Sequence, residues 1–296
     1  MSERQTEPML KVTDLHMQFG GIRALNKINF EVEDGSITAL IGPNGAGKTT
    51  VFNCVTGFYR ATSGNLVLNN QGKITDLGKV LGEKLYAEDL LSPGRFVEKM
   101  HYKLFGGSHR VARAGIARTF QNIRLFREMT AIENLLVAQH MVLNRNPIAA
   151  VVRTPGFKKL ETKVLQHAED WLRIVDLEED SNRLAGELPY GHQRRLEIAR
   201  AMCTDPSLIC LDEPAAGLNP IETKELSQLI TKLRNEHDVT VLLIEHDMSL
   251  VMDISEHIVV LDHGEVIADG KPEDIEKNPA VLAAYLGTEE EEVEEA

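Results

Sequence analysis

The 296-residue sequence has few cysteines, no long apolar run and no excess of positive charge. Its three cysteines, Cys54, Cys203 and Cys210, are scattered and lack the spacing of metal ligands, so we expect reduced core residues. No window offers the roughly 20 consecutive apolar residues that cross a bilayer. The net charge of −13 disfavours a nucleic-acid partner, because phosphate backbones attract a basic surface. These absences argue against a cysteine metal cluster, a membrane-spanning chain and a nucleic-acid-binding protein.

Both ends of the chain are polar. Residues 1–8 lack the apolar segment of a secretion signal, so we expect a flexible N-terminus and a protein that stays in the cytosol. Six glutamates between residues 289 and 295 concentrate negative charge at the other end. Such a run repels itself, so residues 288–296 are predicted to form an acidic, disordered tail.

A glycine-rich loop stands between an apolar run and a helical segment. The run at residues 37–41 reads as a buried strand, and residues 49–56 read as a helix. Glycines let successive backbone N–H groups face phosphate oxygens, and the helix N-terminus adds roughly half a positive charge. Lys48 would reach the β- and γ-phosphates of a nucleotide, and the Thr49 hydroxyl would ligate Mg²⁺. The pattern predicts a nucleoside triphosphate site formed by Gly42, Pro43, Asn44, Gly45, Ala46, Gly47, Lys48, Thr49 and Thr50.

The order of strand and helix patterns predicts an α/β protein with a mostly parallel sheet covered on both faces. The first part reads as β structure, the middle as mainly helical, and the last third alternates strands with helices before a hairpin. Residues of about 71–110 fit neither pattern, and we expect an irregular insertion with one or two short helices. The predicted strands are 9–17, 25–32, 37–41, 208–211, 239–244, 258–261 and 266–268, and the predicted helices of the last third are 221–234 and 248–254.

Acidic and polar side chains follow two of the apolar strands. Asp212 and Glu213 end the strand that begins at Leu208, at the sheet edge where ligands bind in open α/β folds. Asp212 would hold Mg²⁺, and Glu213 would accept a proton from an attacking water. His246 follows the strand at 239–244 and lies within reach of the same edge, although a lone histidine there is more often structural.

Two further segments carry weaker signals. Gln121, taken on its residue type alone, is a surface amide without an assigned role. Gly191 lies just before a helical pattern and offers backbone N–H groups to an anion, but most helices that start with glycine bind nothing.

Together and in this order, these segments resemble the ATP-binding subunit of ATP-binding-cassette (ABC) transporters. In that family, the phosphate loop of one subunit and the signature loop of a second enclose each ATP. The resemblance implies the P-loop NTPase fold of ABC ATPases, with a mostly parallel core sheet, an antiparallel β subdomain and an inserted helical subdomain. It makes residues 9–287 a single ABC ATPase domain, with the helical subdomain at about 110–190 and the irregular insertion at about 71–110.

The resemblance assigns a role to each candidate residue. Phe19 would stack on adenine, and Gln121 would lie near Mg²⁺ and the attacking water. The implied catalytic residues are Glu213 as base, His246 at the γ-phosphate and Lys48, and the implied metal ligands are Thr49, Gln121 and Asp212. The cofactors would be ATP and Mg²⁺. The signature loop, which would contact the ATP of the partner subunit, comprises Leu188, Pro189, Tyr190, Gly191 and His192, and residues 215–220 match the loop that crosses between subunits.

Two positions depart from the family pattern. The signature usually reads Leu-Ser-Gly-Gly-Gln, and Pro189 here removes both the serine hydroxyl and a backbone N–H. If nothing replaces it, the loss of one hydrogen-bond donor to a charged group lowers the stability of the two-subunit complex around ATP by on the order of 1.5–3 kcal/mol. Asn219 stands where aspartate is commoner. Neither change touches Lys48, Asp212 or Glu213, so we expect the chain to hydrolyse ATP.

Both departures, with residues 118–126 and 245–248, resemble the longer ATPase subunit of bacterial branched-chain amino acid importers. The resemblance implies import of leucine, isoleucine and valine by a complex at the cytoplasmic face of the inner membrane, to which this chain would bind peripherally. The partners would be a second, related ATPase subunit in a heterodimer (or a copy of this chain in a homodimer), two transmembrane permeases and, indirectly, an extracytoplasmic solute-binding protein.

Three other functions share these motifs. An importer of urea, amides or another small solute would carry the same ATPase features, because other subunits select the solute. A lipopolysaccharide-export ATPase has a similar architecture. A soluble ABC protein of translation or DNA repair would use ATP as a clamp, although such proteins typically carry two cassettes or a long coiled-coil insertion.

Overall fold

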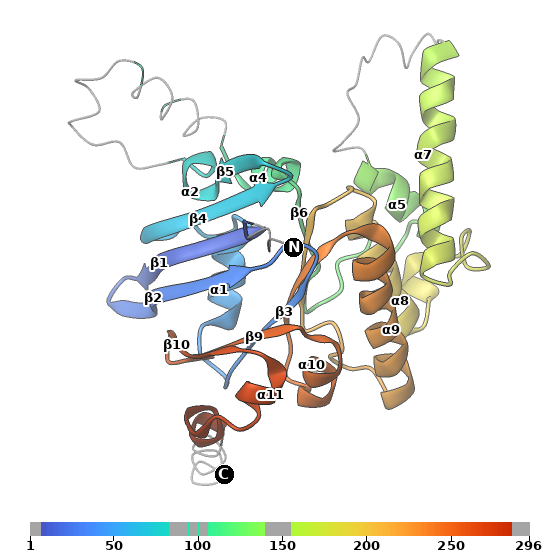
Figure 1. The fold of residues 1–296 in the computed structure, drawn as a ribbon. Coiled ribbons are helices and arrows are strands. Elements are labelled where there is room, and N and C mark those ends of the chain that lie inside the picture. The colour runs from blue at the N-terminus through green and yellow to red at the C-terminus, as the bar shows by residue number, and fades with distance from the viewer. Residues whose placement is uncertain (1–6, 83–93, 95–99, 101–105, 140–154, 286–296) are drawn as a thin grey trace, which may run out of the picture.

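Two sheets form the centre of the computed structural model, which describes residues 7–82, 94, 100, 106–139 and 155–285 (Figure 1). An antiparallel sheet has the strand order β2-β1-β4-β5, and a larger sheet has the order β10-β9-β3-β8-β7-β6. The strands are β1 (Leu10–Phe19), β2 (Ile22–Val32), β3 (Ile37–Ile41), β4 (Ser63–Asn70), β5 (Lys73–Asp76), β6 (Ile116–Arg118), β7 (Leu208–Asp212), β8 (Thr240–Ile244), β9 (His257–Asp262) and β10 (Glu265–Gly270).

Helices cover the larger sheet on one face, and the antiparallel sheet with α1 covers the other (Figure 1). The helices are α1 (Lys48–Val55), α2 (Leu77–Val80), α4 (Ser108–Ala114), α5 (Ala131–Gln139), α7 (Pro155–Ile174), α8 (Tyr190–Met202), α9 (Pro220–His237), α10 (Met248–Ile254) and α11 (Pro272–Ile275). No helix among the described residues is long and apolar enough to cross a membrane.

The three central strands of the larger sheet, β3, β7 and β8, are buried along their whole length. Successive side chains of a strand point to opposite faces. Ala39 and Ile41 therefore pack in the core that includes α8, α9 and α10, while Leu40 packs in the core that includes α1, β1 and β2. Burial on both faces explains why these strands read as continuous apolar runs.

The parallel register brings three strand ends to one edge of the sheet. Leu40 of β3 pairs with Ile244 of β8, and Ile244 pairs in turn with Asp212 of β7. The residues that directly follow these strands, Gly42, Glu213 and Glu245, are therefore neighbours, although the first and last are 203 positions apart in the sequence. This edge carries the phosphate loop, Glu213 and His246.

The α/β fold class is confirmed, and the predicted strands and last-third helices are present with shifts of one to three residues at their ends. The three cysteines are free and buried as expected. Burial raises the pKa of Cys54 to about 12 and that of Cys210 to about 12, which keeps both thiols protonated.

Two regions differ from the expected organisation. Residues 73–80, placed in the irregular insertion, form β5 and α2, because a turn at Gln71 and Gly72 with positive φ folds β5 back on β4. Residues 116–118, placed in the helical subdomain, form β6 and pair with β7. Most of residues 83–105, the first six residues and the predicted tail at 288–296 lie outside the described part of the chain.

Asn219, the residue that departs from the family pattern, begins α9 as its N-cap. Its Oδ1 accepts hydrogen bonds from the N–H groups of Ile221 at 2.9 Å and Glu222 at 3.1 Å. The Glu222 carboxylate accepts one from the Asn219 N–H at 3.0 Å, which completes a capping box. Asparagine therefore stabilises the helix start without an aspartate.

We predict that Asn219→Ala lowers the free energy of unfolding by about 0.5–2 kcal/mol, because two helix N–H groups lose their acceptor. Asn219→Asp keeps the acceptor and should match the wild type. Urea denaturation of the three proteins measures the difference. Equal losses for the alanine and aspartate variants would contradict the assignment of the cap.

A candidate nucleotide site at the carboxyl edge of the sheet

The phosphate loop joins β3 to α1 in a backbone shape that requires glycine. Gly42 has φ of 144°, and a Cβ there would lie 2.0 Å from the carbonyl oxygen of Leu261 in β9. Gly47 has φ of 100° and precedes α1 without a side-chain cap. The first N–H groups of α1 therefore have no side-chain acceptor from the cap and can serve an anion.

Lys48 folds back onto this loop. Its Nζ donates to the carbonyl oxygens of Gly42 at 2.6 Å and Pro43 at 2.8 Å. Burial lowers the pKa of Lys48, while the nearby Glu213 carboxylate raises it. The ammonium group is thus held at the loop, next to the N-terminus of α1.

Glu213 is the point where three of the predicted site residues meet. Gln121 Nε2 donates to its Oε2 at 2.6 Å, and His246 Nε2 donates to its Oε1 at 2.8 Å. Glu213 also has φ of 45°, a conformation that costs a non-glycine residue on the order of 1 kcal/mol. Its N–H donates to the Ile244 carbonyl at 2.9 Å, which fixes the residue at the end of β8.

Asp212 lies beside Glu213 but forms a different contact, a buried ion pair with Arg118. Arg118 Nη2 lies 2.6 Å from Asp212 Oδ2, and the two side chains are 8% and 6% exposed. Arg118 Nη1 also donates to Asn53 Oδ1 at 2.6 Å and Thr56 Oγ1 at 3.1 Å, both in or next to α1. Sequence reasoning gave Arg118 no such role, because its partners Asn53 and Asp212 lie 65 and 94 positions away.

The donor atoms at this edge fit Mg²⁺ bound together with phosphates. Thr49 supplies a hydroxyl and Asp212 a carboxylate, and both are oxygen ligands of the kind this ion prefers. Within the described residues, no group of three or more histidine, cysteine or acidic side chains could hold a metal alone. Mg²⁺ usually shares its ligands between one or two carboxylates and a substrate phosphate, so this sparse set suits it.

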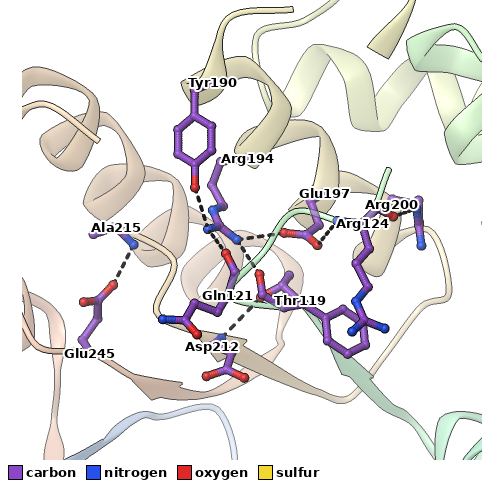
Figure 2. Close-up of polar contacts among 11 residues, drawn as sticks. Thr119, Gln121, Arg124, Tyr190, Arg194, Glu197, Arg200, Asp212, Ala215 and Glu245 are labelled. Carbon is purple, nitrogen blue, oxygen red and sulfur yellow. Dashed lines mark hydrogen bonds and ion pairs between the residues drawn. The ribbon is translucent and has the colours of Figure 1, made fainter. Parts of the chain in front are cut away.

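Glu245 connects two loops of the site and was not predicted. Its Oε1 accepts a hydrogen bond from the Ala215 N–H at 2.6 Å (Figure 2). Its Oε2 accepts one from the His246 N–H at 3.0 Å. Burial raises the pKa of Glu245, and these N–H donors oppose the rise. The Glu245 carboxylate therefore fixes the loop at residues 215–220 (the crossing loop) relative to His246, which contacts Glu213.

The C-terminal segment also reaches the phosphate loop. The hydroxyl of Tyr285 accepts a hydrogen bond from the Gly42 N–H, which opposes the rise in the pKa of Tyr285 caused by burial. Phe19, the residue expected to stack on adenine, is 42% exposed at the end of β1. An edge-to-face contact with Tyr59 supports its ring.

The signature residues lie on the other face of the sheet from the phosphate loop. They begin α8, whose Ile198 and Ala199 pack with Ile41, whereas α1 packs with Leu40. Gly191 is the second residue of this helix rather than the residue before it, because Pro189 caps the helix. Leu188 is buried, Tyr190 is 43% exposed, and His192 Nδ1 contacts Asp180 Oδ2 at 2.9 Å.

We predict that Arg118→Met lowers the free energy of unfolding by about 3–5 kcal/mol, because Asp212 is left buried without its partner. Lys11→Met is the control, since Lys11 pairs with Glu31 at 2.6 Å with both side chains about half exposed. That surface pair should contribute at most about 1 kcal/mol. Equal losses for the two variants, measured by urea denaturation, would refute a structural role for the buried pair.

Comparison with known families gives two matches. A family described as "ABC transporter" matches residues 25–216, and a family described as "Branched-chain amino acid ATP-binding cassette transporter" matches residues 265–291. The second match covers β10, α11 and Tyr285.

Several curated proteins are similar along nearly their whole length. The high-affinity branched-chain amino acid transport ATP-binding protein BraF of Pseudomonas aeruginosa is 52% identical over 282 residues, which cover 95% of this chain and 99% of BraF. The protein of the same description named LivG, from Escherichia coli K12, is 49% identical with the same coverage. A probable LivG of Archaeoglobus fulgidus is 35% identical over 97% of this chain and 98% of its own.

Solved structures agree with these matches. An ATP-binding cassette of an ABC transporter, crystallised in its ADP conformation, superposes with a TM-score of 0.73 at 29% identity, over 95% of this chain and 100% of that one. A nucleotide-free cassette gives a TM-score of 0.71 at 29% identity, over 94% of this chain and 99% of that one.

Proposed function

The chain belongs to the ATP-binding subunits of ABC transporters, and we propose that its ATP hydrolysis drives the import of leucine, isoleucine and valine. One observation carries the choice of solute. Relatives that are 49–52% identical over 99% of their own length are named for branched-chain amino acid transport. The match of residues 265–291 to a branched-chain family supports the same choice independently of the ATPase core.

We propose that the triphosphate binds over the phosphate loop. The N–H groups of the loop and of the first turn of α1 would face its oxygens, and Lys48 would exchange its two carbonyl partners for the β- and γ-phosphates. Thr49, Asp212 and Gln121 would hold Mg²⁺, which offsets the negative charge of the phosphates when bound. Phe19 would stack on the adenine ring.

Glu213 is the group best placed to accept the proton of the attacking water. Both of its carboxylate oxygens accept hydrogen bonds, from Gln121 and His246, so the side chain is oriented before any water arrives. A positioned base of this kind typically contributes about 10²–10⁴-fold in rate. His246, which contacts Glu213, would also contact the γ-phosphate.

A single subunit supplies only half of this site in our proposal. The signature residues pack on the opposite face of the sheet from the phosphate loop, so they would serve the ATP of a second subunit. We propose a second, related ATPase subunit, two transmembrane permeases and, indirectly, an extracytoplasmic solute-binding protein as partners. The chain would then lie at the cytoplasmic face of the membrane.

We predict that Glu213→Gln retains ATP binding and lowers kcat by about 10²-fold or more, because an amide cannot accept the proton. Lys48→Ala is the contrast, since it should weaken ATP binding itself. Fluorescence titration with an ATP analogue and a phosphate-release assay on the assembled transporter separate the two effects. Turnover at the wild-type rate by Glu213→Gln would rule out its assignment as the base.

We predict that cells lacking this gene take up less labelled leucine, isoleucine and valine, and that the wild-type gene restores uptake. Glu213→Gln should fail to restore it, because binding without hydrolysis cannot complete a transport cycle. Undiminished uptake in the deletion strain would leave the ATPase assignment standing. It would contradict the proposed solute and favour urea, amides or another small solute.

A further inference from the structure

A buried arginine of α8 holds the backbone of the segment that carries Gln121 (Figure 2). The Arg194 side chain is 0% exposed. Its Nη1 donates to the Phe120 carbonyl oxygen at 2.7 Å, and its Nη2 donates to the Gln121 carbonyl oxygen at 2.8 Å. A guanidinium is a rigid planar fork, so these two bonds fix consecutive peptide groups relative to the helix.

Glu197, less than one turn further along α8, extends this contact. Its Oε2 accepts a hydrogen bond from Arg194 Nη1 at 2.9 Å, and its Oε1 accepts one from the Arg124 N–H at 3.1 Å. Arg200 then donates to the Arg124 carbonyl oxygen. We refer to Arg194, Glu197 and Arg200 as the α8 clamp. The clamp thus forms hydrogen bonds with the backbone at Gln121 and at Arg124.

The clamp contacts two groups of the proposed site, the Gln121 segment and Tyr190 of the signature. On one side, Gln121 extends from the clamped backbone to Glu213, to which its Nε2 donates at 2.6 Å. On the other side, Arg194 Nη2 donates to the hydroxyl of Tyr190 at 3.3 Å. Tyr190 is the first residue of α8 and belongs to the signature, and it is 43% exposed. Direct contacts therefore connect the signature to Glu213.

We propose that Arg194 is a positioning residue that aims the Gln121 amide at Glu213 and ties its placement to the signature end of α8. This inference rests on the proposed ATPase function. A shift of α8 when the signature meets the partner's nucleotide would move the Gln121 carbonyl directly. No hydrogen bond or ion pair within the described part of the chain joins the clamp to Lys48, so the contacts of Lys48 with the phosphate loop should not depend on it.

The test is Arg194→Met in the assembled transporter. We expect kcat to fall roughly 10- to 100-fold, the usual effect of losing a group that orients a catalytic side chain. The affinity for a fluorescent ATP analogue, measured without Mg²⁺, should stay unchanged, because Lys48 and the phosphate loop keep their contacts. Because Arg194 acts through Gln121, adding Arg194→Met to a Gln121→Ala variant should lower kcat no further. Losses that simply multiply would overturn the proposal.

Three controls separate positioning from loss of folding. Arg173→Met removes an arginine of α7 that pairs with two carboxylates, Asp170 and Glu178, away from the clamp, and it should leave kcat unchanged. Arg194→Lys keeps the charge but not the fork, so it should recover only part of the rate. Arg194→Met combined with Glu197→Met replaces the buried ion pair by apolar groups, a change that often preserves stability, and it should reproduce the low kcat.

The outcomes also separate this inference from the proposed function. If the wild-type complex hydrolyses ATP and the Arg194→Met complex has the same kcat, only the positioning role is overturned. A wild-type complex without ATP hydrolysis would overturn both.

Discussion

The parallel register of β3, β7 and β8 is the constraint on which the rest of this structure depends. Leu40, Ile244 and Asp212 stand side by side across the three strands. Because parallel strands end at the same edge, the phosphate loop, Glu213 and His246 leave the sheet together. A shift of one strand by one residue would also turn its apolar side chains to the wrong core, so the packing of both faces enforces the geometry of the site.

Buried charged side chains hold the loops at this edge in addition to their apolar contacts. Arg118 fixes Asp212 against α1, Glu245 fixes the crossing loop against His246, and Arg194 fixes the segment of Gln121. Buried ion pairs contribute little net stability, because the cost of dehydrating them offsets most of their attraction. These groups restrict geometry instead, since each guanidinium or carboxylate forms good hydrogen bonds with only a narrow set of partner positions. We infer that these charges are present to specify loop positions.

Much of the fold could be predicted from the sequence, because its signals are local. The largely apolar segments of β3, β7 and β8 identified buried strands, and the polar residues at and after their ends identified the site edge. The short strand β5 was missed, since Lys73–Asp76 is polar and half exposed and has no apolar alternation. Arg118, Arg194 and Glu245 were missed for another reason. Their partners lie 30 to 94 positions away, and no periodicity reports such contacts.

Contacts around the signature link the residues that would meet a second subunit to the residues that would catalyse hydrolysis. Tyr190 approaches Gly217 of the crossing loop so closely that a Cβ on the glycine would lie 3.2 Å from its ring. Gly191 packs even more closely on Glu222, since a Cβ there would lie 2.6 Å from the Glu222 carboxylate, which caps α9 together with Asn219. The signature and the loop at residues 215–220, which would both meet a second subunit, are thus in contact with each other. Through Arg194 they also reach Gln121, so in our proposal a partner that reordered this surface would act on the group that orients Glu213.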